Sequence, residues 1–363
     1  MRVWFSNQIW KFKNMPRWKK VVFVLVLVII LVLIFAIWHR YFRQEKIETP
    51  SVVTKVEEPI KTIPSTLDGT LVDSSLANRI PLGVMVENHP DARPQAGLDK
   101  ASIVYEAIAE GGITRFLAIY GPKDASEVGP VRSARTYYVS WAREWKALYA
   151  HVGGNIDALD IIKNEKKVYD LDQFSLGTTA YWRKKLNVAT EHTMFTDTTK
   201  LRAVAATKSY PAEGSFEPNL FKEEQLITSR PEAQSVVVNF STNTYAVKWT
   251  YDKTTNSYLR AMAGTAHKDA VTSEQLSAKN IVIQYVASKA TKTRINEQGA
   301  IFTVTGEGKA KFIQDGIATE CTWKRATEDV RTRFYDSAGN EMKFNAGNTW
   351  YEIVHPDLTV TVS

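Results

Sequence analysis

One uninterrupted apolar run near the start of the chain constrains the architecture more than any other feature. Residues 21–38 read VVFVLVLVIILVLIFAIW and contain no charged residue, no proline and no glycine. An 18-residue helix is about 27 Å long, close to the thickness of the hydrocarbon core of a bilayer. A helix in the core of a soluble domain carries polar residues on one face, and this run has none. We therefore predict one transmembrane helix over residues 21–38.

Basic residues flank this run unevenly. Residues 11–20 contain five lysines and arginines, whereas Arg40 and Arg43 follow the run. The positive-inside rule then places residues 1–20 in the cytoplasm and the folded domains outside. The run is longer than the apolar region of a cleaved signal peptide, and neither a small-x-small cleavage site nor a lipobox cysteine follows it. We therefore expect an uncleaved signal-anchor in the cell membrane, crossing it once.

The net charge of +7 belongs to these flanks rather than to the folded part. Residues 1–46 hold nine basic residues and one acid, a charge of +8, which leaves −1 on the remainder. The net charge therefore does not imply a basic, nucleic-acid-binding surface on the folded part. The single cysteine, Cys321, excludes an intramolecular disulfide and a cysteine-rich metal site. We expect it in a buried strand.

The rest of the chain divides into a linker and two domains. Residues 39–80 contain three prolines and many serines and threonines without apolar periodicity, which predicts an extracytoplasmic linker. Residues 81–225 mix helical and strand-like patterns. Residues 231–363 consist of short β-branched and aromatic runs separated by turns. The expected fold class is α+β, with a mixed α/β domain followed by a mostly antiparallel β domain.

Within the first domain, local patterns predict several elements. Residues 82–87 form a short apolar run and predict a buried strand. Residues 103–110 and 113–120 flank Gly111-Gly112 and predict a hairpin, with a helix over 99–110 as the alternative. Residues 131–146 follow Gly129-Pro130 and predict a helix with proline at its start. Residues 148–152 predict a strand, and Gly153-Gly154-Asn155 leads into a predicted helix over 156–163.

The motif GPVRSAR at residues 129–135 is the sharpest candidate for a binding site. The start of a helix presents free backbone N–H groups and the positive end of the helix dipole. Arg132 and Arg135 would share a face of that helix, and Ser133 adds a hydroxyl. Together they would hold a phosphate or a carboxylate. The alternative is an internal network in which both arginines pair with Glu87, Glu106 or Glu110.

No serine hydrolase, penicillin-binding, zincin or Walker motif occurs in the chain. Candidate catalytic residues are therefore isolated acids and histidines near the ends of elements. They are Glu87 after a strand, His151 before a glycine pair and His192 in the run TEHTMF. His89 and Arg93, in a loop with two prolines, are further candidates for ligand contact. The histidines lack metal-ligand spacing, so we expect no metal and no cofactor, although separated histidines can converge on zinc.

Five ordered motifs carry a resemblance to a known family. They are VENHPDARPQAGL at 86–98, IVYE at 103–106, EGGITR at 110–115, GPVRSAR at 129–135 and HVGG at 151–154. The chain resembles the YerB-like family of bacterial envelope proteins, strongly over residues 80–195 and more loosely in the β region. This resemblance implies an extracytoplasmic, membrane-attached protein of a Gram-positive-type bacterium, and it supplies no reaction. Many members look like lipoproteins, whereas this chain has a transmembrane anchor.

Two functions follow from these patterns, and a purely structural envelope protein is a third possibility. The first is a module that binds an anionic wall component such as peptidoglycan, or a wall-synthesis protein. The second is a hydrolase or transferase acting on wall polymers, with glutamate or histidine as acid and base beside the arginine pair. The first is favoured because no nucleophile–base pair is visible. The two differ in whether Glu87, His151 and Arg132 converge in one cleft.

Overall fold

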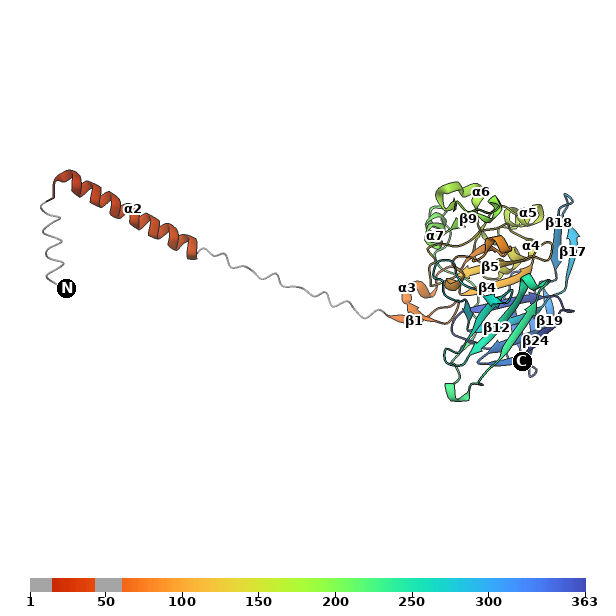
Figure 1. Ribbon diagram of the computed structural model, residues 1–363. Helices are drawn as coiled ribbons and strands as arrows, with labels where there is room; N and C mark the ends of the chain where they lie inside the picture. Colours follow the sequence, from red (N-terminus) through yellow and green to blue (C-terminus); the bar gives the residue numbers. More distant parts are fainter. Residues whose placement is uncertain (1–14, 43–60) are drawn as a thin grey trace. The chain divides into compact units, whose positions relative to one another are not determined.

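The computed structural model describes residues 15–42 and 61–363 (Figure 1). Helix α2 (Arg17–Phe42) contains the apolar run, and none of its side chains is buried. Its 26 residues make it long and apolar enough to cross a membrane. The contacts of the chain separate it into two units, residues 1–58 and 59–363.

A ten-stranded mixed sheet forms the centre of the second unit. Its strands lie in the order β21-β20-β19-β16-β23-β4-β5-β3-β6-β7. Five come from the first predicted domain: β3 (Leu82–Glu87), β4 (Ile103–Ile108), β5 (Thr114–Tyr120), β6 (Leu148–His151) and β7 (Tyr169–Asp172). Five come from the second: β16 (Asn280–Tyr285), β19 (Gly306–Gln314), β20 (Ile317–Arg325), β21 (Arg333–Tyr335) and β23 (Thr349–Val354). The two predicted domains therefore share one sheet, joined where β23 pairs with β4 in parallel.

A second sheet covers one face of the large one. It runs β14-β13-β12-β11-β24, with β15 on the side of β13. The strands are β11 (Ser235–Asn239), β12 (Ala246–Asp252), β13 (Ser257–Met262), β14 (Thr265–Ala266), β15 (Ser277–Ala278) and β24 (Val360–Val362), and all their pairings are antiparallel. Residues alternate along β12, so that Val247, Trp249 and Tyr251 point inward. They share a core with Val84 and Trp350 of the large sheet.

Helices cover the opposite face. In α4 (Thr136–Glu144), Tyr138 and Trp141 are buried against Tyr105 and Tyr351 of the sheet, and α5 (Ile156–Glu165) adds to the same core. Helix α7 (Thr198–Thr207) packs with the first core instead. Figure 1 shows these helices gathered in the upper part of the folded unit and the strands of the smaller sheet below. The result is a layered α+β fold, as predicted.

The remaining elements are short. Strand pairs join β1 (Thr62–Pro64) with β2 (Leu71–Asp73), β8 (Tyr181–Arg183) with β9 (Met194–Thr196), β10 (Phe221–Lys222) with β22 (Phe344–Asn345), and β17 (Ser288–Lys292) with β18 (Gln298–Phe302). Helices α3 (Ser74–Ala77) and α6 (Gln173–Leu176) have four residues each. The 3₁₀ turns are η1 (Pro90–Ala92), η2 (Leu98–Lys100), η3 (Gly177–Thr179), η4 (Thr190–His192), η5 (Ile227–Ser229) and η6 (Asn243–Tyr245).

Two predicted boundaries differ from the structure. The predicted linker ends at residue 80, whereas residues 61–80 already belong to the folded unit: Leu67 is buried, and Asp68 accepts a hydrogen bond of 2.6 Å from Ser102. The helix predicted over 131–146 begins only at Thr136. The residues before it are extended because their backbones pair with distant segments, such as Val131 with Val86.

Gly97 is a position where only glycine fits. Its φ is +84°, and a Cβ atom there would overlap the carbonyl oxygen of Glu127. We expect Gly97→Ala to lower the free energy of unfolding by about 2 kcal/mol or more, because backbone strain and a steric clash add together. Gly264 has a similar φ of +78° with open space around it, so Gly264→Ala should cost only the strain, about 1 kcal/mol. Urea denaturation of both variants checks this, and equal losses would contradict it.

Candidate functional site

A group of charged and aromatic polar side chains, which we call the histidine cluster, gathers at the end of β3. Its members are Glu87, His89, Asp91, Arg132 and His192. Strand β3 ends at Glu87, and the chain then turns into η1, where His89 accepts a hydrogen bond of 3.3 Å from the backbone N–H of Asp91. His192 is the last residue of η4. The cluster thus joins residues from three separate sequence segments.

Glu87 lies at the centre of the cluster and is only 1% exposed. Its Oε1 accepts hydrogen bonds from the backbone N–H groups of Asn88 and His89, at 3.1 and 3.2 Å. Its Oε2 forms an ion pair with Nε of Arg132 and lies 3.6 Å from Nδ1 of His192. The buried atoms Oε2 of Glu87, Nε of Arg132 and Nδ1 of His192 have no well-aligned hydrogen bond. The sequence alternative that paired Arg132 with Glu87 is therefore the arrangement observed.

The two histidines of the cluster lie against each other. The rings of His89 and His192 are stacked, with centroids 4.7 Å apart and planes at 9°. His192 is buried, whereas the side chain of His89 is 34% exposed. Asp91 is exposed, and its Oδ2 lies 3.7 Å from Nδ1 of His89. The cluster therefore has a buried side at Glu87 and an open side at Asp91.

Arg135 forms an ion pair with Glu110, which also lies 3.6 Å from Arg115 across the glycine turn of the β4–β5 hairpin. Burial disfavours the charged form of Glu110, but the hydrogen bond from Arg135 and the charges of both arginines outweigh it and lower the pKa of Glu110. Glu106 turns to the other face of the sheet and contacts Arg260. The predicted ion pair of Arg135 with an acid is therefore present with Glu110, whereas Glu106 takes no part in it.

Ser133 and Arg135 line a polar hollow of about 330 Å³. Its other lining residues are Glu110, Gly154, Asn155, Glu297 and Gln298. Asn155 is the N-cap of α5, and its Oδ1 accepts a hydrogen bond of 3.0 Å from the N–H of Ala158. The hollow therefore lies at the N-terminus of α5. Arg135 is also the N-cap of α4, but the predicted helix start at residue 131 is wrong, because α4 begins at Thr136 and both Arg132 and Ser133 precede it.

Two other predicted site residues are held in internal contacts. His151 is fully buried; its Nδ1 lies 2.7 Å from the carbonyl oxygen of Gly153 and its Nε2 lies 3.0 Å from Asp170. His192, rather than His151, is the histidine that lies beside Glu87 and Arg132. Arg93 donates hydrogen bonds to Asn88 and to the carbonyl oxygen of Thr244, and so connects the site loop to the smaller sheet.

Three contributors to these sites have little signal in the sequence. Asp91 belongs to the exposed proline loop, where a single carboxylate resembles any other surface acid. Glu297 and Gln298 come from the β17–β18 hairpin, which packs Phe302 against Tyr137 of α4 at a ring distance of 4.2 Å. Only the capping role of Asn155, after two glycines and before a helical pattern, could have been identified locally.

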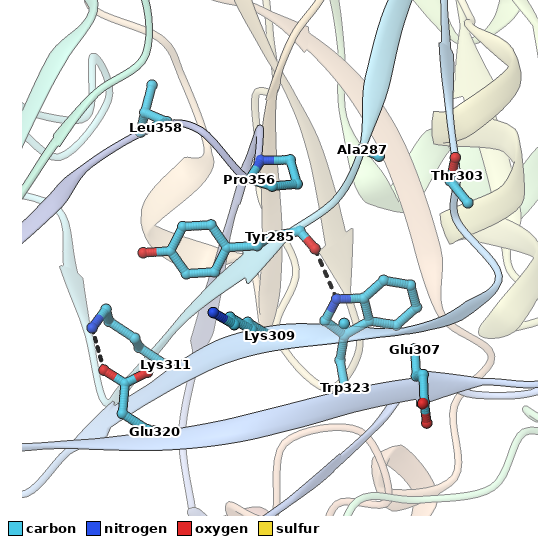
Figure 2. A pocket seen from close by; sticks show the side chains of 11 residues that line it. Tyr285, Ala287, Thr303, Glu307, Lys309, Lys311, Glu320, Trp323, Pro356 and Leu358 are labelled. Carbon is cyan, nitrogen blue, oxygen red and sulfur yellow. Dashed lines mark hydrogen bonds and ion pairs between the residues drawn. The ribbon is translucent and has the colours of Figure 1, made fainter.

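A further hollow of about 560 Å³ lies in the C-terminal half (Figure 2). Tyr285, Pro356 and Leu358 form its apolar part, and Lys309, Lys311, Glu307 and Glu320 are its charged side chains. Trp323 donates its indole N–H to the carbonyl oxygen of Tyr285 at 2.9 Å, while Lys311 pairs with Glu320. The cations and acids balance, so this groove offers apolar contact and little net charge.

Comparison with known proteins identifies relatives over most of the chain. Residues 67–211 match the family described as "Protein of unknown function (DUF3048) N-terminal domain", and residues 236–351 match its C-terminal domain. The chain is 31% identical over 318 residues to the "Putative lipoprotein YerB" of Bacillus subtilis. The aligned region covers 87% of this chain and 91% of the relative. The crystal structure of YerB superimposes with a TM-score of 0.74 at 29% identity, covering 83% of this chain and 99% of that one.

Proposed function

This chain belongs to the YerB-like DUF3048 family, and we propose that it is a membrane-anchored, extracytoplasmic protein of the cell envelope that binds an anionic wall component. A relative named as a lipoprotein supports attachment to a membrane. Helix α2 supplies the attachment here. The basic residues before it support a cytoplasmic N-terminus and a single pass. The relative from Bacillus subtilis supports an envelope of the Gram-positive type.

The polar hollow supports the binding of an anion. Arg135, the hydroxyl of Ser133 and the amide of Asn155 offer donors, and the N-terminal end of the ten-residue helix α5 adds the positive end of its dipole. Arg115 and Arg135 neutralise Glu110, while Glu297, which also lines the hollow, contributes one negative charge. The observation that carries the proposal is this convergence of donors around a hollow of about 330 Å³. Phosphate and carboxylate groups of wall polymers have the matching chemistry.

Ser133→Asp is expected to weaken binding to wall material about tenfold, because a carboxylate in the hollow repels an anion. Among residues 15–42 and 61–363 no partner hydrogen-bonds to the side chain of Ser133, and the substitution retains the carbonyl oxygen that Arg115 contacts, so we expect the fold to stay intact. The measurement is co-sedimentation of the full chain, in detergent, with sacculi that carry or lack their anionic polymers. Ser337→Asp, in an exposed turn, is the control with the same charge change. Equal binding by both variants would overturn the site.

The histidine cluster favours the second candidate, a hydrolase or transferase acting on wall polymers. A buried carboxylate 3.6 Å from an imidazole, beside an arginine, is a set of groups that can move a proton and stabilise negative charge. Mass spectrometry of the sacculi after incubation detects any product. Products that disappear with Glu87→Gln would establish the enzyme. Binding without products would leave the binding function alone.

A further inference from the structure

The histidine cluster contains the atoms of a metal site. One atom from each of His89, Asp91 and His192 can be chosen so that all three lie within 4.8 Å of one another. Among residues 15–42 and 61–363, this is the one group of three or more histidine, cysteine or acidic side chains with that geometry. Ligand atoms around tetrahedral zinc are roughly 3.3 Å apart, since each bond is about 2.0–2.1 Å long. The separations between the three ligand atoms would therefore have to shorten by about 1.5 Å at most for all three to bind one ion.

The side chains on the open side are free to make this movement. Asp91 is exposed, and the side chain of His89 is 34% exposed. The stacked arrangement keeps the two imidazole planes parallel, so the ring of His89 has to turn for both lone pairs to point at one ion. His192 is buried and stays in place, which makes it the fixed point of the set.

Glu87 orients His192 in the way that carboxylates orient metal-binding histidines. Its Oε2 lies 3.6 Å from Nδ1 of His192, and both buried atoms lack a hydrogen-bond partner. A proton on Nδ1 faces this carboxylate and leaves Nε2 unprotonated for a metal ion. A proton on Nδ1 directed at this carboxylate would thus give the buried Nδ1 of His192 a partner when the histidine acts as a ligand.

From this geometry we propose that His89, Asp91 and His192 bind a divalent first-row transition metal ion, with Glu87 as the positioning residue of His192. Two imidazoles and one carboxylate suit zinc, cobalt or iron(II), whereas magnesium and calcium require oxygen ligands. The carboxylates of Asp91 and Glu87 balance the charge of the ion, whereas Arg132, which contacts the same Oε2 of Glu87 as His192 does, opposes it. Three protein ligands leave a coordination position open for water or for an anion.

This site is independent of the polar hollow, because the two share no residue.

A second His-Pro-Asp tripeptide provides a matched control. His355 and Asp357 repeat the sequence of His89 and Asp91, and the N–H of Asp357 also donates to the histidine Nδ1 at 3.3 Å. Both residues are exposed, and within residues 15–42 and 61–363 no further histidine, cysteine or acid completes a set of three with them. This tripeptide has the same local geometry without His192.

The test uses the full chain in detergent, free of any histidine tag and stripped of metal with a chelator. Addition of cobalt(II) is expected to produce a visible absorption band at one ion per chain, which zinc displaces and magnesium does not. His89→Ala should weaken binding at least tenfold, and Glu87→Gln should weaken it about 10–100-fold. His355→Ala should leave the affinity unchanged.

Two results would overturn the metal site. One is the absence of the cobalt band, together with no zinc-dependent rise in the melting temperature of the wild-type chain. The other is an equal loss of affinity in His89→Ala and His355→Ala. His89 is on the open side, so its variant folds even where His192→Ala does not. Wall binding measured with the same samples separates this proposal from the function of the polar hollow.

Discussion

Replacing Arg260 with methionine is expected to lower the free energy of unfolding by about 3–5 kcal/mol, because the change leaves the carboxylate of Glu106 buried without its cation. Arg260 lies between the two sheets and is fully buried. Its guanidinium forms an ion pair with Glu106, which is also fully buried, and lies 2.9 Å from Nδ1 of His267. The loss of a partner is severe here because water cannot replace it.

Aromatic rings hold the same guanidinium in place. The carbon at its centre lies 5.7, 5.3 and 4.6 Å from the rings of Phe116, Trp249 and Trp350, which belong to both sheets. Methionine fills much of the volume and keeps apolar contact with these rings, so the expected loss reports charge rather than a cavity. Arg260 therefore stabilises the contact between the sheets through electrostatics as well as packing.

Urea denaturation of the full chain in detergent, followed by tryptophan fluorescence, measures this loss. Arg294→Met is the matched control, because Arg294 pairs with Asp160 at 2.7 Å but its side chain is 57% exposed. Exposed pairs contribute about 1 kcal/mol or less. The double variant Glu106→Gln/Arg260→Met should recover part of the loss, since it removes the unpaired charge. A loss for Arg260→Met no larger than that for Arg294→Met would refute the argument.

Elements that depend on local patterns could be predicted from the sequence. The apolar run became α2, the glycine pair at residues 111–112 became the β4–β5 turn, and the segment after Asn155 became α5. The shared sheet could not be predicted, because β23 pairs with β4 from the far end of the chain. Such a pairing leaves no periodic signal in either strand, since both faces of the sheet are covered and both strands are apolar.

The candidate site follows the same division. The sequence places Glu87 at the end of a strand, and the structure agrees. The error at residues 131–135 has a tertiary cause: the N–H of Val131 donates to Met194 and that of Arg132 to Met85, so proline could not start a helix there. His192 lies beside Glu87 because of the strand that follows it, β9. The bridge between Thr196 of β9 and Val128 joins this strand to the segment that contains Arg132. Contacts between distant segments therefore decide which candidates converge.

Glu352 is a second buried acid in the layer between the sheets. Its side chain is fully buried, and its Oε1 accepts a hydrogen bond of 2.8 Å from the indole of Trp249. Burial and the neighbouring Glu106 together raise the pKa of Glu352, Arg260 opposes the shift, and the resulting pKa is about 8. Glu352 is therefore protonated at neutral pH, and a carboxylic acid can share a hydrogen with the Glu106 carboxylate.

Wild type is expected to lose about 4 kcal/mol of stability relative to Glu352→Gln between pH 5 and pH 9. The folded state retains a proton on Glu352 that the unfolded chain releases near its ordinary pKa of 4.5, so stability falls as pH rises towards 8. Glutamine keeps the acceptor for Trp249 and cannot ionise, and comparison with this variant cancels the titrating groups that do not interact with Glu352. Glu106 does interact with it, so the measured difference belongs to this pair of acids. Glu274→Gln, at an exposed position, should retain the wild-type slope. If the free energies of unfolding of wild type and Glu352→Gln changed in parallel across this pH range, Glu352 would be ionised throughout. The layer between the sheets would then hold two carboxylates and one arginine.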